Sequence, residues 1–225
     1  MAYLGPTWDL SGPIGIWGSN EVHPRKNPRM KIERERAGCR RRALRSRSPR
    51  KQTMSLEQHR AESSDSLRFA IITFSDTRDE ASDAGGSYLV ERLTEAGHQI
   101  SRRALHPDEP QQIEAAVRGA VLAPDVDLVL TTGGTGISPR DRTVPVLEQM
   151  FAGTIPGFGE LFRHLSFEEI GSAAILSRAT AGLVAGKVVM ALPGSPKALR
   201  LALDRIILPE AGHLVSQTTA QNRKA

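Results

Sequence analysis

Three short, nearly continuous apolar runs constrain the fold of this chain more than any other feature. They span residues 69–74, 126–132 and 187–192. Runs of this length and composition are typical of strands that are buried on both faces, as in a parallel sheet. A further, more polar strand is expected at residues 99–105, before the turn-forming sequence His106-Pro107-Asp108.

The segments that separate these runs carry apolar residues at helical spacing. The pattern indicates helices over residues 83–96, around 113–120 and over 196–215. Strands that alternate with helices form right-handed parallel βαβ units. We therefore expect an α/β fold, a three-layer α/β/α sandwich with a mostly parallel central sheet. In such sheets, ligands bind beyond the carboxyl ends of the strands.

The positive charge of the chain is concentrated before residue 54. Residues 1–53 contain 13 Lys and Arg against 4 Asp and Glu, whereas the remainder contains 17 against 21. Because like charges repel and few apolar residues offset chain entropy, residues 1–65 are expected to form a basic, disordered extension. The folded domain is expected to span residues 66–218, with a polar tail at 219–225.

Two alternatives stay open for the extension. Met54 is a plausible translation start, in which case residues 1–53 are never made. The tract Arg40-Arg41-Arg42 is otherwise able to bind RNA, DNA or anionic lipid, with an affinity that falls steeply with salt. The remainder is mildly acidic and gives no support to a nucleic-acid partner.

Cysteine content and hydropathy indicate where in the cell the protein is expected. The single cysteine, Cys39, excludes an intramolecular disulfide. No apolar run approaches the ~18 residues that span a bilayer, and the N-terminus lacks the charge pattern of a signal peptide. We therefore expect a cytoplasmic protein with no membrane partner.

A glycine-rich loop directly follows the apolar run at residues 126–132. It begins Thr131-Thr132-Gly133-Gly134-Thr135-Gly136 and ends at Arg140-Asp141. Such glycines let backbone N–H groups approach a bound anion, and the threonine hydroxyls add donors. Arg140 suits phosphate, and Asp141 suits Mg²⁺ or the positioning of a nucleophile. On the glycines alone, a tight turn without a ligand is an equal alternative.

A second loop, Pro193-Gly194-Ser195, precedes the last expected helix. Ser195 is a good N-cap, and helix N-termini attract anions, so this corner is a candidate for phosphate or pterin binding. A plain helix cap is the alternative interpretation of the same residues.

Acidic residues form a third group, after the first two strands. Its members are Asp76, Asp83, Asp108 and Glu109. Each is ordinary in a turn or a first helical turn. Together with Asp141, however, they are able to surround a polyphosphate and its metal. The histidines show no metal-ligand spacing, and no serine or cysteine has a triad context, so a zinc enzyme or a hydrolase is not indicated.

The order of these loops resembles the molybdopterin-binding domain family of molybdenum-cofactor biosynthesis. The matching motifs are Ser75-Asp76, Pro107-Asp108-Glu109, the glycine-rich loop with Arg140-Asp141, and Pro193-Gly194-Ser195-Pro196. The segments 156–163, 165–171 and 176–179 are similar to the MoaB branch of that family. The resemblance covers residues 67–215.

The resemblance implies a reaction and its site. Active family members adenylylate molybdopterin with MgATP and release pyrophosphate. It implies that Asp108 and Asp141 are the essential carboxylates, which act on Mg²⁺ and the reacting phosphates. Residues 133–136 would form the anion cradle, Ser195 would lie at the pterin end, and Asp76 and Asp83 near the nucleotide. Homotrimers or hexamers, and other proteins of the same pathway as partners, are implied as well.

One departure from the family pattern leaves an alternative open. Where the family often has Asp-Thr/Lys-Ser-Gly, this chain has Asp83-Ala84-Gly85-Gly86, so a hydroxyl donor is absent. Some MoaB-type proteins lack activity and the Pro-Arg-Asp-x-Thr pattern, which this chain keeps at residues 139–143. An enzyme is therefore favoured over a non-catalytic oligomer that binds molybdopterin or acts as a scaffold.

The segment from Phe151 to Glu169 also allows two interpretations. Phe158, Leu161, Phe162 and Leu165 recur at helical spacing. A mixture of core and subunit interface is expected for them, and direct substrate contact is the alternative.

Overall fold

The computed structural model describes residues 66–222. The expected basic extension at residues 1–65, with its alternative start at Met54, lies outside the described residues, as do residues 223–225 of the expected tail. Within the described part, no helix combines the length and the apolar character that crossing a membrane requires.

A six-stranded sheet forms the centre of the domain. Its strands are β1 (Arg68–Phe74), β2 (Gln99–His106), β3 (Leu128–Thr132), β4 (Gly153–Thr154), β5 (Thr180–Val184) and β6 (Lys187–Leu192). They lie in the order β2-β1-β3-β6-β5-β4. Neighbouring strands among β2, β1, β3 and β6 are parallel, whereas β5 and β4 are antiparallel to their neighbours. The expected α/β fold with a mostly parallel sheet is confirmed.

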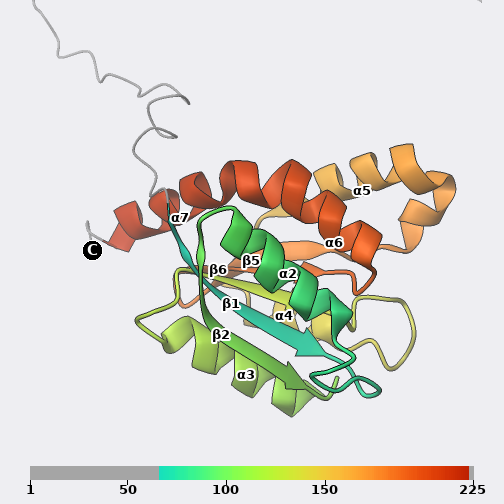
Figure 1. Cartoon of the computed structure of the whole chain (residues 1–225), viewed down its shortest axis with the longest axis horizontal. Coiled ribbons are helices and arrows are strands. Elements are labelled where there is room, and N and C mark those ends of the chain that lie inside the picture. The colour runs from blue at the N-terminus through green and yellow to red at the C-terminus, as the bar shows by residue number, and fades with distance from the viewer. Residues whose placement is uncertain (1–65, 223–225) are drawn as a thin grey trace, which may run out of the picture. The chain divides into compact units, whose positions relative to one another are not determined.

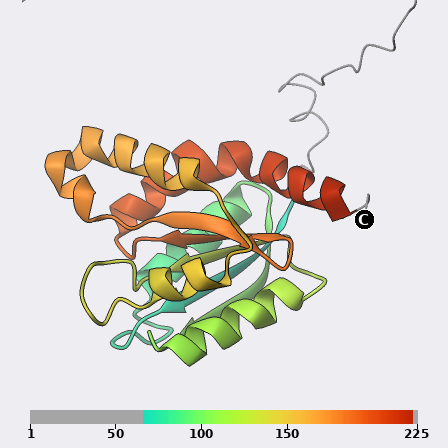
Figure 2. The same cartoon turned by 180° about the vertical axis from the view of Figure 1, so that it is seen from behind.

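Helices cover both faces of the sheet (Figures 1 and 2). They are α2 (Ala84–Glu95), α3 (Pro110–Leu122), α4 (Thr143–Met150), α5 (Pro156–Ile170), α6 (Pro196–Ala202) and α7 (Leu208–Asn222). Alternate residues of β1 point to opposite faces. Phe69 and Ile71 therefore join the apolar cluster under α2, α5, α6 and α7, whereas Ala70 and Ile72 join the cluster under α3 and α4. These are the three expected layers.

The C-terminal helical region is longer and less regular than expected. A π-helical segment, η2 (Leu203–Ile207), joins α6 to α7. The N–H of Leu208 donates to the carbonyl of Leu203, and the next residue, Pro209, has no N–H to donate. A wider turn is a usual way to accommodate such a break. Helix α7 continues to Asn222, so residues 219–222 of the expected polar tail are helical.

Helix α5 confirms the core interpretation of the segment before residue 170. Phe158, Phe162 and Leu165 are buried in it, whereas Leu161 is exposed. A 3₁₀ segment, η1 (Gly171–Leu176), follows and leads into β5. Strands β4 and β5 were not expected from the sequence.

The parallel strands bring four loops to one edge of the sheet. In the register, Phe74 lies beside His106, Thr73 beside Thr132, and Thr132 beside Leu192. The carboxyl ends of β1, β2, β3 and β6 are therefore neighbours, and the loops that follow them face a common space.

Candidate active site

A cavity of about 390 Å³ lies at this edge of the sheet. It is lined by Phe74, Ser75, Asp76, Thr77, Arg78, Asp108, Gly133, Gly134, Thr135, Gly136, Ser138, Arg140, Asp141 and Gly194. Three loops that are far apart in the sequence thus supply most of one site, and a fourth contributes Gly194.

The glycine-rich loop requires glycine at two positions. Gly133 has φ +94° and Gly134 has φ +58°, a region that other residues avoid. A Cβ atom at Gly133 would lie 2.1 Å from the carbonyl oxygen of Phe74. At Gly134 it would lie 2.2 Å from Oδ2 of Asp108 and 2.2 Å from Oγ1 of Thr143. The loop therefore lies directly against the β1 end and the Asp108 carboxylate.

The same loop presents free backbone donors. The N–H groups of Gly134, Thr135 and Gly136 make no hydrogen bond within residues 66–222, and all three residues line the cavity. Buried or half-buried N–H groups are normally paired. A run of three without protein acceptors, in a glycine-rich turn, has the character of an anion-binding nest.

Asp108 is a buried carboxylate without a cationic partner within the described residues. Its Oδ1 accepts hydrogen bonds from the backbone N–H of Arg142 and from Oγ1 of Thr143, each at 3.3 Å. Burial raises the pKa of Asp108 above its ordinary value, and the nearby charges of Asp141 and Asp76 act in the same direction. The ionised form therefore lacks compensation that a bound cation would supply.

Asp141 is held by a turn of its own. Its Oδ2 accepts a hydrogen bond of 2.8 Å from the backbone N–H of Ser138, and its N–H donates to the carbonyl of Ser138 at 2.9 Å. A Cβ atom at Gly136 would lie 2.7 Å from the same Oδ2. The carboxylate therefore lies against the glycine-rich loop, on the same cavity as Asp108.

Arg140 lines the cavity, but its charge is already balanced. It pairs with Asp76 and, at 3.2 Å, with Glu109. The hydrogen bond from Arg140 lowers the pKa of Asp76, as does the bond from the backbone N–H of Asp108. Carboxylates on two neighbouring loops thus occupy the guanidinium of Arg140, and its binding of phosphate stays a prediction.

The chain as a whole is similar to a known family and to solved structures. The family of probable molybdopterin-binding domains matches residues 70–213. A Bacillus cereus protein named molybdenum cofactor biosynthesis protein B is 44% identical over 169 residues, which cover 75% of this chain and 100% of the relative. A crystal structure of a molybdenum cofactor biosynthesis protein B is 45% identical, with a TM-score of 0.68, over 69% of this chain and 98% of that one.

A more distant crystal structure supports the same assignment. The tungsten cofactor synthesizing protein MoaB from Pyrococcus furiosus is 34% identical, with a TM-score of 0.62, over 69% of this chain and 98% of that one. The chain belongs to the molybdopterin-binding domain family, in its MoaB branch. The resemblance stated from the sequence is thereby confirmed.

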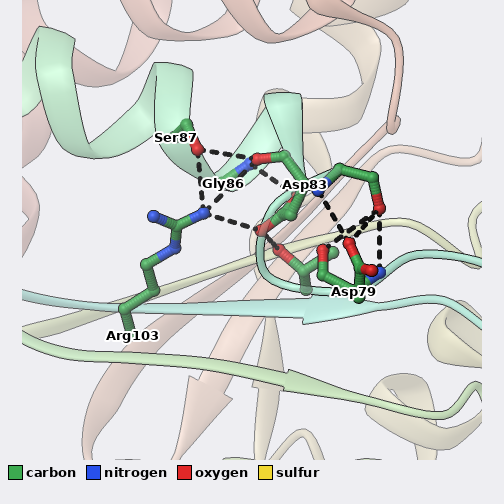
Figure 3. A network of polar contacts seen from close by, with 7 residues as sticks. Asp79, Asp83, Gly86, Ser87 and Arg103 are labelled. Carbon is green, nitrogen blue, oxygen red and sulfur yellow. Dashed lines mark hydrogen bonds and ion pairs between the residues drawn. The ribbon is translucent and has the colours of Figure 1, made fainter.

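Asp83, which the resemblance places near the nucleotide, is a buried structural residue at the start of α2 in this MoaB-type chain. It is buried below the start of α2 and does not line the cavity. Its Oδ1 accepts from the N–H of Gly86 at 2.9 Å, and its Oδ2 accepts from Oγ1 of Thr73 at 2.8 Å. Figure 3 shows Arg103 extending from β2 toward Asp83 and Ser87. Asp83 is thus the N-cap of α2 and joins it to two strands.

Three further expected residues also lie outside the cavity lining. Oγ1 of Thr131 is buried and donates to the carbonyl of Met190 at 3.2 Å. Ser195 is exposed and caps α6, where its Oγ accepts from the N–H of Ala198 at 3.3 Å. Pro193 accepts a hydrogen bond of 3.3 Å from Thr132 through its carbonyl. Within the loop 193–195, Gly194 is the residue that reaches the cavity.

Arg178 stabilises the glycine-rich loop without lining the cavity, a role that was not predicted from the sequence. Its guanidinium donates to three backbone carbonyls, those of Thr135, Gly136 and Asp141. It therefore connects the glycine-rich start of the loop with Asp141 at its end. The only signal in the sequence was its place in the segment 176–179, which resembles the family without indicating a role.

The donor set on the cavity fits a hard divalent cation. Within residues 66–222, no three His, Cys, Asp or Glu side chains converge as a ready-made metal cage. Mg²⁺ in nucleotide sites is usually held by one or two carboxylates and by the phosphates of the substrate. Asp108, with an oxygen free of protein donors in the described part, and Asp141 are carboxylates of that kind.

Proposed function

We propose that the chain acts in molybdenum cofactor biosynthesis as a molybdopterin adenylyltransferase that uses MgATP. In this reaction, a phosphate oxygen of molybdopterin forms a bond to the α-phosphorus of ATP. The bond from that phosphorus to the bridging oxygen of the β-phosphate breaks, and pyrophosphate leaves with its electron pair. The relatives named above support the pathway, and the geometry of the cavity supports the reaction class.

The observation that carries the proposal is the convergence of two carboxylates and a free N–H nest on one cavity. Asp108 and Asp141 supply oxygen ligands, and residues 134–136 supply donors for phosphate oxygens. Transfer of a phosphorus group depends on positioning and charge neutralisation more than on covalent help from the protein. The N–H groups are suited to position phosphate oxygens, and the two carboxylates are suited to hold the Mg²⁺ that would neutralise phosphate charge.

Different residues of the chain would bind the metal, bind the phosphates and position these groups. Asp108 and Asp141 would hold Mg²⁺ together with substrate phosphates. When bound, Mg²⁺ neutralises phosphate charge and stabilises the leaving pyrophosphate. The N–H groups of residues 134–136 would bind phosphate oxygens, and Arg178 keeps these donors and Asp141 in register.

The test is an activity assay on the full chain with molybdopterin and MgATP. Adenylylated product and pyrophosphate are followed, with and without Mg²⁺. We expect Asp141→Asn and Asp108→Asn to remove turnover while both variants stay folded. Asp125→Asn is the matched control, because Asp125 is exposed at the opposite edge of the sheet and pairs with Arg102. Near-wild-type turnover in Asp141→Asn would refute the assignment of that residue.

A non-catalytic role in the same pathway is the second candidate. The specific observation in its favour is the segment 84–86, which offers no side-chain hydroxyl near the cavity. Asp83 is committed to the α2 cap at the same place. Under this alternative, the folded protein binds molybdopterin but yields no adenylylated product with MgATP in the assay above.

We also propose that the chain forms a homo-oligomer. Among the described residues, large exposed hydrophobic side chains gather in α5 and η1: Leu161, Phe167, Ile170, Ile175 and Leu176. Exposed apolar groups in this density are typical of interaction surfaces. Light scattering on the full chain tests the assembly, and Phe167→Ser is expected to weaken it. A monodisperse monomer at working concentration would refute this proposal.

A further inference from the structure

Arg78 is a cationic side chain in the cavity that the proposed reaction has not used. It lines the cavity, is half-buried, and makes no hydrogen bond or ion pair within residues 66–222. Arg140, the other arginine of the lining, pairs with carboxylates, and Arg178, which contacts the glycine-rich loop, donates to backbone carbonyls. A half-buried guanidinium that has no protein partner on the cavity is available to pair with an anionic ligand.

The guanidinium of Arg78 lies between two glycines. A Cβ atom at Gly194 would lie 3.6 and 3.7 Å from its two terminal nitrogens. A Cβ atom at Gly85 would lie 3.9 Å from one of them. The side chain therefore reaches from the loop after β1 toward the loop after β6. Gly85 and Gly194 have no side chains, so neither can offer the guanidinium a side-chain acceptor.

The loop that carries Arg78 is anchored before and after it. On one side, the N–H of Ser75 donates to the carbonyl of His106 at 2.9 Å, and Asp76 accepts from the N–H of Asp108 at 3.1 Å. On the other side, Asp79 and Ser82 exchange backbone to side-chain hydrogen bonds of 2.8 and 2.9 Å (Figure 3). The backbone that carries Arg78 is thus preorganised, which reduces the entropy that ligand binding costs.

The charges of the cavity lining are unevenly distributed. Asp108 and Asp141 are without cationic partners in the described residues, whereas Asp76 is balanced by Arg140. Arg78 is the lining cation that remains uncompensated within residues 66–222. A ligand with a metal ion on one part would complement the two carboxylates. A phosphate without metal on another part of the same ligand would complement Arg78.

We propose that Arg78 binds a phosphate oxygen of the ligand that occupies this cavity. The guanidinium presents two N–H groups to a phosphate in parallel, which a carboxylate-paired arginine such as Arg140 cannot do. The inference rests on the proposed function in one respect, that the ligand carries phosphate. Two sources share this chemistry: the nucleotide, and the phosphate of molybdopterin.

Calorimetric titration of the full chain distinguishes the two sources. MgATP and molybdopterin are titrated separately into wild type, Arg78→Met and Arg78→Lys. We expect Arg78→Met to weaken one of the two ligands by about 10- to 100-fold, the range for a charge-assisted hydrogen bond. Arg78→Lys should recover part of the loss, since it keeps the charge but not the fork. The ligand that loses affinity identifies the phosphate.

Arg118→Met is the matched control. Arg118 is an exposed arginine on α3 that pairs with Glu114, so its loss changes the net charge equally without touching the cavity. All variants also carry the same basic residues 1–53, and any binding there cancels in the comparison. Melting temperatures without ligand should match, because Arg78 makes no bond that holds the described fold. Should Arg78→Met melt several degrees lower, Arg78→Gln replaces it.

The outcomes separate this inference from the proposed function. Unchanged binding of both ligands in a folded neutral variant overturns the role of Arg78, even where the wild type turns over. Binding that depends on Arg78 in a wild-type protein without turnover supports Arg78 and contradicts the enzyme. A wild type that binds neither ligand contradicts both.

Discussion

The guanidinium of Arg178 donates a hydrogen bond of 3.0 Å to the backbone carbonyl oxygen of Asp141. The same group reaches the carbonyls of Thr135 and Gly136. Arg178 precedes β5, whereas Asp141 ends the loop after β3, so these bonds connect two segments that the sheet itself does not join directly. The position of a proposed catalytic carboxylate therefore depends on a residue outside its own loop.

Replacement of Arg178 by methionine should lower kcat more than it raises KM. Asp141 and the N–H nest would still be present to bind phosphates, but they would lose the common anchor that sets their positions for the reaction. A displacement of about 1 Å at such a group costs about 100-fold in rate. Arg178→Lys should recover part of the activity, since lysine keeps a donor but reaches fewer carbonyls. Steady-state kinetics on the adenylylation reaction measure both parameters.

Arg163→Met provides the comparison for Arg178. Arg163 is nearby and donates a single hydrogen bond of 3.3 Å to the carbonyl of Ala179, not to the loop at 135–141. Its loss should leave kcat close to that of the wild type. Equal effects of the two substitutions would mean that Arg178 merely contributes to general stability.

Gly134→Ala should both destabilise the domain and impair the site. The backbone has φ +58° there, and the new methyl group would lie 2.2 Å from Oδ2 of Asp108. Backbone strain of this kind costs about 1–3 kcal/mol, and displacement of Asp108 should remove most of the turnover. Gly119→Ala is the control: Gly119 lies in α3 with open space around its Cα. Urea unfolding should show Gly119→Ala to be more stable by about 0.5–1 kcal/mol.

The strands that could be predicted from the sequence are those whose burial on both faces requires a continuous run of apolar residues. The apolar runs 69–74, 126–132 and 187–192 correspond to β1, β3 and β6, because strands covered on both faces need apolar residues at every position. Strand β5 escaped prediction because Thr180–Val184 contains a glycine and small residues, and β4 has two residues. Their antiparallel pairing depends on partners that no local pattern specifies.

The parts of the site that could be predicted are those whose position follows from the topology of the sheet. Loops after parallel strands must meet at one edge, which placed Asp108, Asp141 and residues 133–136 on a common cavity. Which charged groups are free was not predictable, since that depends on tertiary partners. Asp76 and Asp83 follow the same strand, yet the first lies at the cavity and the second is buried as a helix cap. Arg140 and Arg78 both line the cavity, but within the described residues only Arg140 is paired with carboxylates.

Asp108→Asn should stabilise the fold near neutral pH while it removes turnover. Burial raises the folded-state pKa of Asp108, so the folded protein holds that proton more tightly than the unfolded chain does. The stabilisation linked to that proton is full below the unfolded pKa of about 3.8 and is lost as pH rises through the folded pKa. Asparagine keeps an oxygen for Arg142 N–H and Thr143 Oγ1.

The pH dependence distinguishes this explanation from a packing effect. The stability gained by Asp108→Asn over wild type should be largest near pH 7 and should shrink as pH falls toward the ordinary aspartate range. Thermal melts across this range measure the difference. A difference that is constant with pH would mean that burial of the charge is not its cause. Asp125→Asn, at an exposed ion pair, serves as the control.

Asp83→Ala should cost about 2–4 kcal/mol of unfolding free energy, because it removes a buried N-cap and leaves Oγ1 of Thr73 without its acceptor. It also breaks the ion pair with Arg103, whose guanidinium keeps Oγ of Ser87 as an acceptor. Asp83→Asn should cost less, since asparagine also caps helices well. Ser195→Ala, which removes the exposed cap of α6, sets the scale at about 1 kcal/mol. Urea unfolding measures all three. If Asp83→Ala kept its stability but bound MgATP more weakly, Asp83 would act on the nucleotide, and its structural role at α2 would be refuted.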